Sequence, residues 1–239
     1  MSTGAAPSGA QDAEARLAAL LLSFAGGFVD TFSFVVLFGL FTAHVTGNFV
    51  LIGAALAHPS HHGIVGKLLA LPMFIAAVAA ARWLQRRRER RGLGSARLLV
   101  AVQLALLVVF MMAGQLLGPF DAADDAVAVA TGLVGVAAMA VQNAASRGAF
   151  AHLSPTTVMT GNVTQVTMDL VDRWLGDAAA GPGPGSARIA KMWPPIVAFA
   201  VGAVAAGFTC RAIGFACLLL PIAALLVLWW RLRAAAPSA

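Results

Sequence analysis

The sequence has 239 residues, of which 60% carry hydrophobic side chains and only 11% are charged. Soluble globular domains carry about 25% charged residues, so this composition excludes an ordinary soluble domain. The net charge is +6, but many basic residues lie in one short segment, Arg82 to Arg97, with no aromatic or glycine-rich nucleic-acid motif beside it. We therefore expect a multi-pass protein whose partner is the lipid bilayer, and no nucleic-acid partner.

Apolar runs of about 20 residues follow one another along the chain, which is the length that spans a hydrocarbon core of about 30 Å. They predict an all-α integral membrane protein with about six transmembrane helices. Residues 1–14 are rich in Gly, Ala, Ser and Pro, and we expect them to form a disordered tail. The predicted spans are residues 17–40, 64–84, 98–117, 126–147, 189–210 and 215–230.

A Thr-Gly-Asn tripeptide occurs twice, about 114 positions apart, each time as a polar break inside an apolar run. The first copy stands in TAHVTGN and the second in TTVMTGN. The halves also share the order of their elements: a span, a break, a short helix at residues 49–57 or 163–171, a proline-bearing span and a plain span. Because internal duplication is common in transporter folds, we divide the chain into two repeats, residues 15–120 and 121–239.

Two arrangements of the breaks compete, because each break either crosses the membrane or dips in and returns. Re-entrant breaks give six spans and inverted repeats, whereas crossing breaks give eight spans and parallel repeats. The six-span arrangement places all of the 16 lysines and arginines except Lys67 and Arg211 on one side, and the eight-span arrangement distributes them almost evenly. The positive-inside rule favours six spans, with both termini cytoplasmic.

In the inverted arrangement the two breaks meet near the bilayer midplane. We expect Asn48 and Asn162 to act there as N-caps of two short returning helices. Each helix N-terminus carries a partial positive charge of about half a unit, which attracts an anion or carboxylate, or repels cations from a pore for neutral solutes. The charge pattern does not rank these alternatives.

Other polar residues stand at matching places before the two breaks. Asp30 precedes the first break, and Gln142 and Asn143 precede the second. An intramembrane carboxylate is a functional candidate by default, as an ion ligand or proton carrier, although a structural Asp bonded to the returning loop is the alternative. His44 is predicted to pair with Asp30 and to titrate near neutrality, unless it is only a hydrogen-bonding spacer.

Two groups of residues are candidates for a substrate or ion pathway. The primary group is Asp30, Thr46, Gly47, Asn48, Asn143, Thr160, Gly161 and Asn162. The secondary group is His44, Gln142, Thr156 and Thr164. Threonines inside a membrane helix often bond back to their own backbone, which is the structural alternative for the outer ones. The cluster His58, His61 and His62 is interpreted as a solvated turn, so we predict no metal site and no cofactor.

The segments GGFVDTFSF, TAHVTGN and TTVMTGN resemble those of the YoaK-like bacterial integral membrane proteins, the domain of unknown function 1275 family. The resemblance covers nearly the whole chain, from about Arg16 to Trp230. It implies a protein of the bacterial inner membrane with about six helices, and it supplies neither a substrate nor a catalytic residue. The paired asparagine-bearing breaks are also similar in layout to those of aquaporins, but the NPA tripeptides are absent.

The duplicated breaks predict a small-solute membrane transporter or channel, with its site at the tripeptides and Asp30 coupling transport to protons or ions. A non-transporting membrane scaffold or sensor is the alternative. We do not expect an enzyme, because HExxH and GxSxG motifs are absent and Asp30 has no second carboxylate at similar depth. The substrate and the oligomeric state stay open, with a homo-oligomer among the alternatives.

Overall fold

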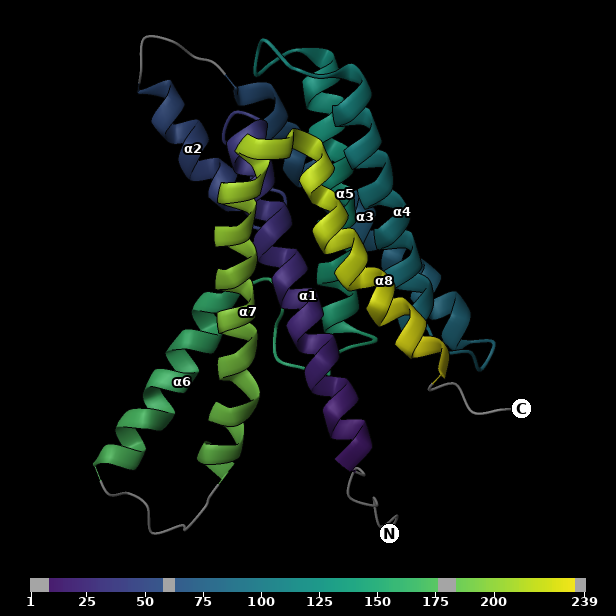
Figure 1. Cartoon of the computed structure of the whole chain (residues 1–239), viewed down its shortest axis with the longest axis vertical. Helices are drawn as coiled ribbons and strands as arrows, with labels where there is room; N and C mark the ends of the chain where they lie inside the picture. The colour runs from purple at the N-terminus through teal and green to yellow at the C-terminus, as the bar shows by residue number, and fades with distance from the viewer. Residues whose placement is uncertain (1–8, 58–62, 176–183, 235–239) are drawn as a thin grey trace.

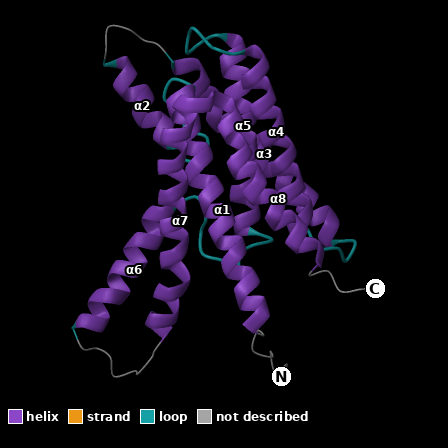
Figure 2. Cartoon of the chain, viewed as in Figure 1, coloured by secondary structure: helices purple, strands orange, loops and turns teal. Residues whose placement is uncertain are grey.

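The structure is a computed structural model, and it describes residues 9–57, 63–175 and 184–234. Within these ranges all regular structure is helical, and no strand is present (Figure 2). The elements in chain order are α1 (Gly9–Val36), α2 (Gly47–Leu56), α3 (Ile64–Glu89), α4 (Ala96–Leu117), α5 (Ala126–Arg147), α6 (Met159–Trp174), α7 (Pro184–Ile213), the 3-10 helix η1 (Gly214–Leu218) and α8 (Leu219–Ala234).

Five apolar stretches within the described ranges are long enough to cross a membrane. Four of them fall on α1, α3, α4 and α5, and the fifth, Gly185–Arg233, has 49 residues and holds both α7 and α8. Figure 1 shows α7 rising to η1 and α8 descending from it, so this last stretch is a helical hairpin. The protein is therefore a multi-pass α-helical membrane protein, as its composition predicts.

The two short helices follow the two Thr-Gly-Asn breaks. With 10 and 16 residues, α2 and α6 are about 15 and 24 Å long, which is less than the thickness of a hydrocarbon core. Figure 1 shows that they run in opposite directions, α2 toward the upper end of the molecule and α6 toward the lower end. Each packs against the long helix that follows it, α2 on α3 and α6 on α7.

The N-terminal tail differs from the prediction. Helix α1 begins at Gly9, so the expectation of disorder over residues 1–14 is wrong for residues 9–14, and residues 1–8 lie outside the described ranges. The segment GAQDAEARLAAL is rich in alanine, the strongest helix former, and Asp12 lies in the first turn, where a negative charge stabilises the helix. The Gly, Ser and Pro residues that suggest disorder lie almost entirely within residues 1–9.

Helix α1 forms the centre of the core. Its residues Phe28 and Phe32 are fully buried. The Phe32 ring meets Phe110 of α4 and Phe215 of η1 edge to face, with ring centroids 5.9 and 5.0 Å apart. Because such aromatic pairs contribute about 0.5–1.5 kcal/mol beyond the area they bury, they fix α1 against α4 and the turn of the hairpin.

Helix α1 also packs closely on α7 through two glycines. A Cβ atom added at Gly27 would lie 2.1 Å from the carbonyl oxygen of Phe199, and one added at Gly202 would lie 2.2 Å from the carbonyl oxygen of Phe24. The contact is reciprocal, since each glycine faces the backbone of the other helix. Small residues allow such close approach of membrane helices, where packing replaces the hydrophobic effect.

Replacing Gly202 should break this contact. We expect Gly202→Ala to lower the stability of the purified protein by about 1–3 kcal/mol, because the new methyl group overlaps the Phe24 carbonyl. Gly207→Ala is the matched control in the same helix, since nothing lies within 4 Å of a Cβ there and alanine favours the helix. Thermal unfolding in detergent measures both, and equal melting temperatures would contradict the close packing of α1 on α7.

Candidate functional site

Two irregular segments interrupt the helical bundle. The first connector, residues 37–46, joins α1 to α2, and the second connector, residues 148–158, joins α5 to α6. Helix α1 ends where Phe38 and Gly39 adopt positive φ angles of 54° and 80°, which reverse the chain. Each connector then returns along the helix that precedes it, so that its polar groups lie beside polar side chains of that helix.

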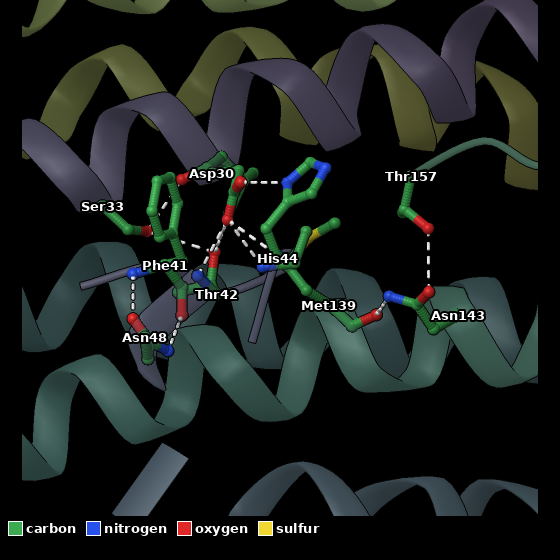
Figure 3. A network of polar contacts seen from close by, with 11 residues as sticks. Asp30, Ser33, Phe41, Thr42, His44, Asn48, Met139, Asn143 and Thr157 are labelled. Atoms are coloured by element: carbon green, nitrogen blue, oxygen red, sulfur yellow. Dashed lines mark hydrogen bonds and ion pairs between the residues drawn. The ribbon is translucent and has the colours of Figure 1, made fainter. Parts of the chain in front are cut away.

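Asp30 holds the first connector. Its side chain is buried, and its Oδ1 atom accepts the backbone N–H groups of Thr42 and Ala43 at 2.8 and 2.6 Å. The Thr42 hydroxyl donates to the same oxygen at 3.3 Å, and the backbone N–H of His44 lies 3.4 Å away. Figure 3 shows these bonds converging on one carboxylate oxygen. A carboxylate in this position is tolerated because the connector supplies donors in place of water.

His44 completes the environment of Asp30, and the predicted pairing of the two residues is confirmed. The His44 Nδ1 atom lies 2.6 Å from Asp30 Oδ2, while 36% of the His44 side chain is exposed. Its ring lies between Phe41 and Phe199 of α7, with centroids 6.2 and 5.9 Å away. In Figure 3 the second ring nitrogen points away from Asp30. The imidazole therefore joins the buried carboxylate to the surface of the bundle.

The two tripeptide asparagines make equivalent contacts. Asn48 pairs with the backbone of Phe41: its Oδ1 accepts the N–H at 3.0 Å and its Nδ2 donates to the carbonyl at 2.9 Å. Asn162 Nδ2 donates to the carbonyl of Pro155 at 2.9 Å, also seven residues earlier. Proline has no N–H, so the second bond of the pair cannot form there. Both amides are buried and fasten a connector to the helix that follows it.

The predicted N-cap role of these asparagines is wrong. The N-cap residue of α2 is Thr46, and that of α6 is Val158, and neither side chain makes a capping hydrogen bond. Asn48 is the second residue of α2, which begins at Gly47, and Asn162 is the fourth residue of α6, which begins at Met159. The amide bonds the connector instead, because the connector passes beside the first turn of the short helix.

Gln142 takes the place in the second half that Asp30 takes in the first. It is fully buried, its Oε1 accepts from Gln103 Nε2 at 2.7 Å, and its Nε2 donates to the carbonyl of Leu22 at 2.8 Å and to the Thr156 hydroxyl at 3.2 Å. One amide thus joins α5 to α4, to α1 and to the second connector. Unlike the carboxylate, this group cannot change its charge.

Asn143 adds a second attachment. The Thr157 hydroxyl donates to Asn143 Oδ1 at 2.8 Å, and Asn143 Nδ2 donates to the carbonyl of Met139 at 3.0 Å, as Figure 3 shows. The predicted correspondence of polar residues before the two breaks therefore has a structural counterpart. In each half a helix side chain binds a connector residue that lies 12–14 positions further along the chain.

The remaining tripeptide residues lie on the outside of the bundle. Thr46, Thr160 and Gly161 are exposed, and only Gly47 packs closely, since a Cβ there would lie 3.0 Å from the Phe41 ring. The Thr164 hydroxyl donates to the carbonyl of Thr160 at 2.9 Å, so the structural alternative accounts for this secondary candidate. The asparagines are buried and the threonines point outward, and a pathway role of the threonines stays a prediction.

Two lysines, Lys67 and Lys191, each donate a hydrogen bond to the backbone carbonyl of a connector residue. Lys67 of α3 is buried and donates to the carbonyls of Phe38 and Gly63 at 2.9 and 2.8 Å. Lys191 of α7 donates to the carbonyl of His152. Phe38 and His152 are separated by about 114 positions, the spacing of the tripeptides. A lysine near the start of each proline-bearing helix was the sequence signal for these contacts.

Helix α6 has its own attachment to α7. Asp169 is buried and accepts from Arg188 of α7, with Nε and Oδ2 2.7 Å apart and one terminal nitrogen 2.5 Å from Oδ1. Gln165 Nε2 donates to Asp169 Oδ1 at 2.9 Å. The bidentate arrangement is the geometry that arginine and a carboxylate favour, so it fixes the direction of α6 as well as its position.

Three cavities in the described part of the bundle lie away from the tripeptides. One of about 640 Å³ lies between α1, the second connector and α7, one of about 510 Å³ is a groove on α1 and α7, and a small one adjoins Lys67. No tripeptide residue lines any of these three, so a shared cavity between the breaks stays a prediction.

In the described part of the chain no group of three His, Cys, Asp or Glu residues is placed to hold a metal, and His58, His61 and His62 lie outside it.

Comparison with known proteins gives one match. The family model described as protein of unknown function (DUF1275) matches residues 18–230. No curated protein and no solved structure matches the chain. The matched range contains both connectors, both asparagines and the Asp30–His44 pair.

The two asparagines should differ in their contribution to stability. We expect Asn48→Ala to cost about 2 kcal/mol, because it leaves both the N–H and the carbonyl of Phe41 without their partner, and Asn162→Ala to cost about 1 kcal/mol, because only one carbonyl is affected. Thr46→Ala, on the exposed side of the same tripeptide, is the control and should change little. Thermal unfolding of the purified variants gives the order, and a larger loss in Asn162→Ala would refute it.

Proposed function

We propose that this chain, which belongs to the family of proteins of unknown function (DUF1275), is a small-solute membrane transporter whose pathway lies at the two connectors. The observation that carries the proposal is the Asp30–His44 pair, a carboxylate and an imidazole 2.6 Å apart in the core of a membrane bundle. Ionisable groups inside a membrane are costly, and they commonly mark the pathways of ions, protons or substrates.

The proposed architecture is two inverted repeats with re-entrant connectors, and the helix packing supports it. Helix α1 packs on α7 and α5 packs on α3; α8 packs on α1 and α4 packs on α5. The two halves correspond if α1 is matched with α5, α3 with α7 and α4 with α8. The contact of α1 with α7 then corresponds to that of α5 with α3, and the contact of α1 with α8 corresponds to that of α5 with α4. The opposite directions of α2 and α6 in Figure 1 agree with inversion. In transporters of this kind the site lies where the broken helices of the two repeats meet.

The proposed orientation places the lower end of Figure 1 in the cytoplasm of a bacterium, with the protein in the inner membrane. Helix α1 starts at that end, and α3, α5, α7 and α8 have basic residues near their lower ends. These residues include Arg86, Arg87, Arg88, Arg147, Arg188, Arg231 and Arg233. The positive-inside rule then makes both termini cytoplasmic.

The Asp30–His44 pair gives the transporter a charge switch. With His44 neutral, the pair carries the negative charge of Asp30 alone, which repels an anion. When His44 takes a proton, the pair becomes neutral overall, and the partial positive charge at the start of α2 is then free to attract an anion. Because the pair holds the first connector, one proton changes the charge where α2 begins. This arrangement favours co-transport of a proton with a small anion or weak acid.

A non-transporting scaffold or sensor is the second candidate, and one observation favours it. Asp30, Gln142 and both asparagines already have hydrogen-bond partners that fasten the connectors. In a scaffold this network would serve stability alone, and loss of the Asp30 charge would have no consequence once the bonds are preserved.

The substitution Asp30→Asn separates the two candidates. An asparagine at 30 can still accept the N–H groups of Thr42 and Ala43, so the fold should persist, but the negative charge of the pair is lost. We expect wild-type protein to raise proton-driven uptake of labelled acetate above that of protein-free liposomes. Asp30→Asn should lose at least about nine-tenths of this increase, because the pair no longer holds a charge that a proton can cancel; this is a loss of about 1.4 kcal/mol or more.

Controls make that experiment decisive. Asp124→Asn also removes a carboxylate that accepts two backbone N–H groups, those of Gly63 and Val65, but it lies outside both connectors and should retain uptake. Labelled phosphate and glycerol represent inorganic anions and neutral solutes. If the wild type moves none of the three solutes, the transporter proposal fails and the scaffold is preferred; if Asp30→Asn transports as well as the wild type, the charge switch fails.

The six-span topology has a separate test. Single cysteines are introduced at Gly94, Ala122 and Leu175 after Cys210 and Cys217 have been replaced by alanine, and a membrane-impermeant thiol reagent is applied to intact cells. We expect labelling of Ala122→Cys only, because Gly94 and Leu175 follow the lower ends of α3 and α6. Labelling of Leu175→Cys together with Ala122→Cys would require α6 to point the other way.

A further inference from the structure

The cavity of about 640 Å³ between α1, the second connector and α7 has charged residues in its lining that the Asp30–His44 network does not explain. Its cations are Arg16 of α1 and Lys191 of α7, and Asp12 is its acid, so basic groups exceed acidic ones. Gln11 and His152 also line it. Anionic ligands are therefore favoured over cationic ones.

Ser154 and Lys191 bring further hydrogen-bonding groups to the wall of this cavity. Ser154 lines the cavity, is 7% exposed, and its Oγ atom has no hydrogen bond. Buried polar groups in proteins almost always have partners, so this hydroxyl has a hydrogen bond still to make, although its oxygen is closed off from the open space of the cavity. Lys191 donates one of its three N–H groups to the carbonyl of His152, which leaves two for that ligand.

Hydrogen-bond acceptors lie beside these donors. Pro194 and Pro195 are inside α7 and have no N–H, so the carbonyls of Ala190 and Lys191, four residues earlier, lose their usual helical donors. All four residues line the cavity. A ligand that combines anionic oxygens with hydroxyl groups matches this mixture of cations and carbonyls without helical donors.

An apolar groove continues from the cavity. Leu20 and Pro194 line both the cavity and the groove of about 510 Å³ on α1 and α7. The other residues of the groove are all apolar: Leu21, Phe24, Trp193, Val197, Ala198 and Val201. Trp193 is 55% exposed, and indoles prefer the interface between headgroups and acyl chains. A charged pocket that leads into an apolar groove at this depth has the shape of a lipid site.

We propose that the cavity and the groove bind one anionic phospholipid of the phosphatidylglycerol type. Arg16 and Lys191 hold the phosphate, the glycerol hydroxyls donate to the carbonyls of α7 that lack helical donors, and one acyl chain lies in the groove. Basic pockets between membrane helices are suited to anionic headgroups. A zwitterionic lipid would bring an ammonium group toward the two cations and is disfavoured. The proposal does not depend on transport activity.

Lipid titration of the delipidated full-length protein tests the site, with native mass spectrometry to count bound lipid. We expect phosphatidylglycerol to bind roughly tenfold more tightly than phosphatidylcholine of the same chains, and the double variant Arg16→Ala, Lys191→Ala to lose this preference. The double variant Arg231→Ala, Arg233→Ala removes the same charge from α8 outside the cavity and should keep it.

Two further measurements separate the sources of affinity. Arg16→Ala alone keeps the contact of Lys191 with His152, so it tests charge without disturbing that bond and should weaken binding roughly fivefold. Glycerophosphoglycerol, which has the headgroup but no acyl chain, should not displace the lipid. Equal affinity for the two lipids, unchanged binding in the cavity variants, or full displacement by the acyl-free headgroup would each overturn the proposal.

Discussion

Backbone groups of an irregular segment inside a membrane bundle need hydrogen-bond partners, because no water is there to supply them. The connectors meet this demand with side chains from the helices beside them. Asp30 accepts the N–H groups of Thr42 and Ala43, and Asn48 and Asn162 bind the main chain seven residues earlier. These few bonds allow the chain to leave α1 and α5, return along them and begin a short helix within the bundle.

The two halves meet that demand with different chemistry. In the first half the central group is a carboxylate paired with an imidazole, and in the second it is the neutral amide of Gln142, which also joins α4 and α1. A charge change is therefore available in one half, while the other provides a fixed frame. The first connector is therefore held by a pair that can gain a proton, and the second by an amide that cannot.

Much of this arrangement could be predicted from the sequence, because it follows from apolar length and local spacing. The spans and the pairing of His44 with Asp30 are examples. The roles of Asn48 and Asn162 could not, since Asn before a helix usually means a cap, and only the path of the connector reveals its partner. The carbonyl contact of Lys67 joins residues 29 positions apart and has no local signature.

Pro155 makes the two short helices differ in how firmly each is attached to its connector. The first connector is latched to α2 by two hydrogen bonds, whereas the missing N–H of proline leaves the second latched to α6 by one. Separating the second connector from α6 breaks one such bond, whereas separating the first connector from α2 breaks two. The connector side of α6 is therefore the looser of the two, while the Asp169–Arg188 pair keeps α6 on α7.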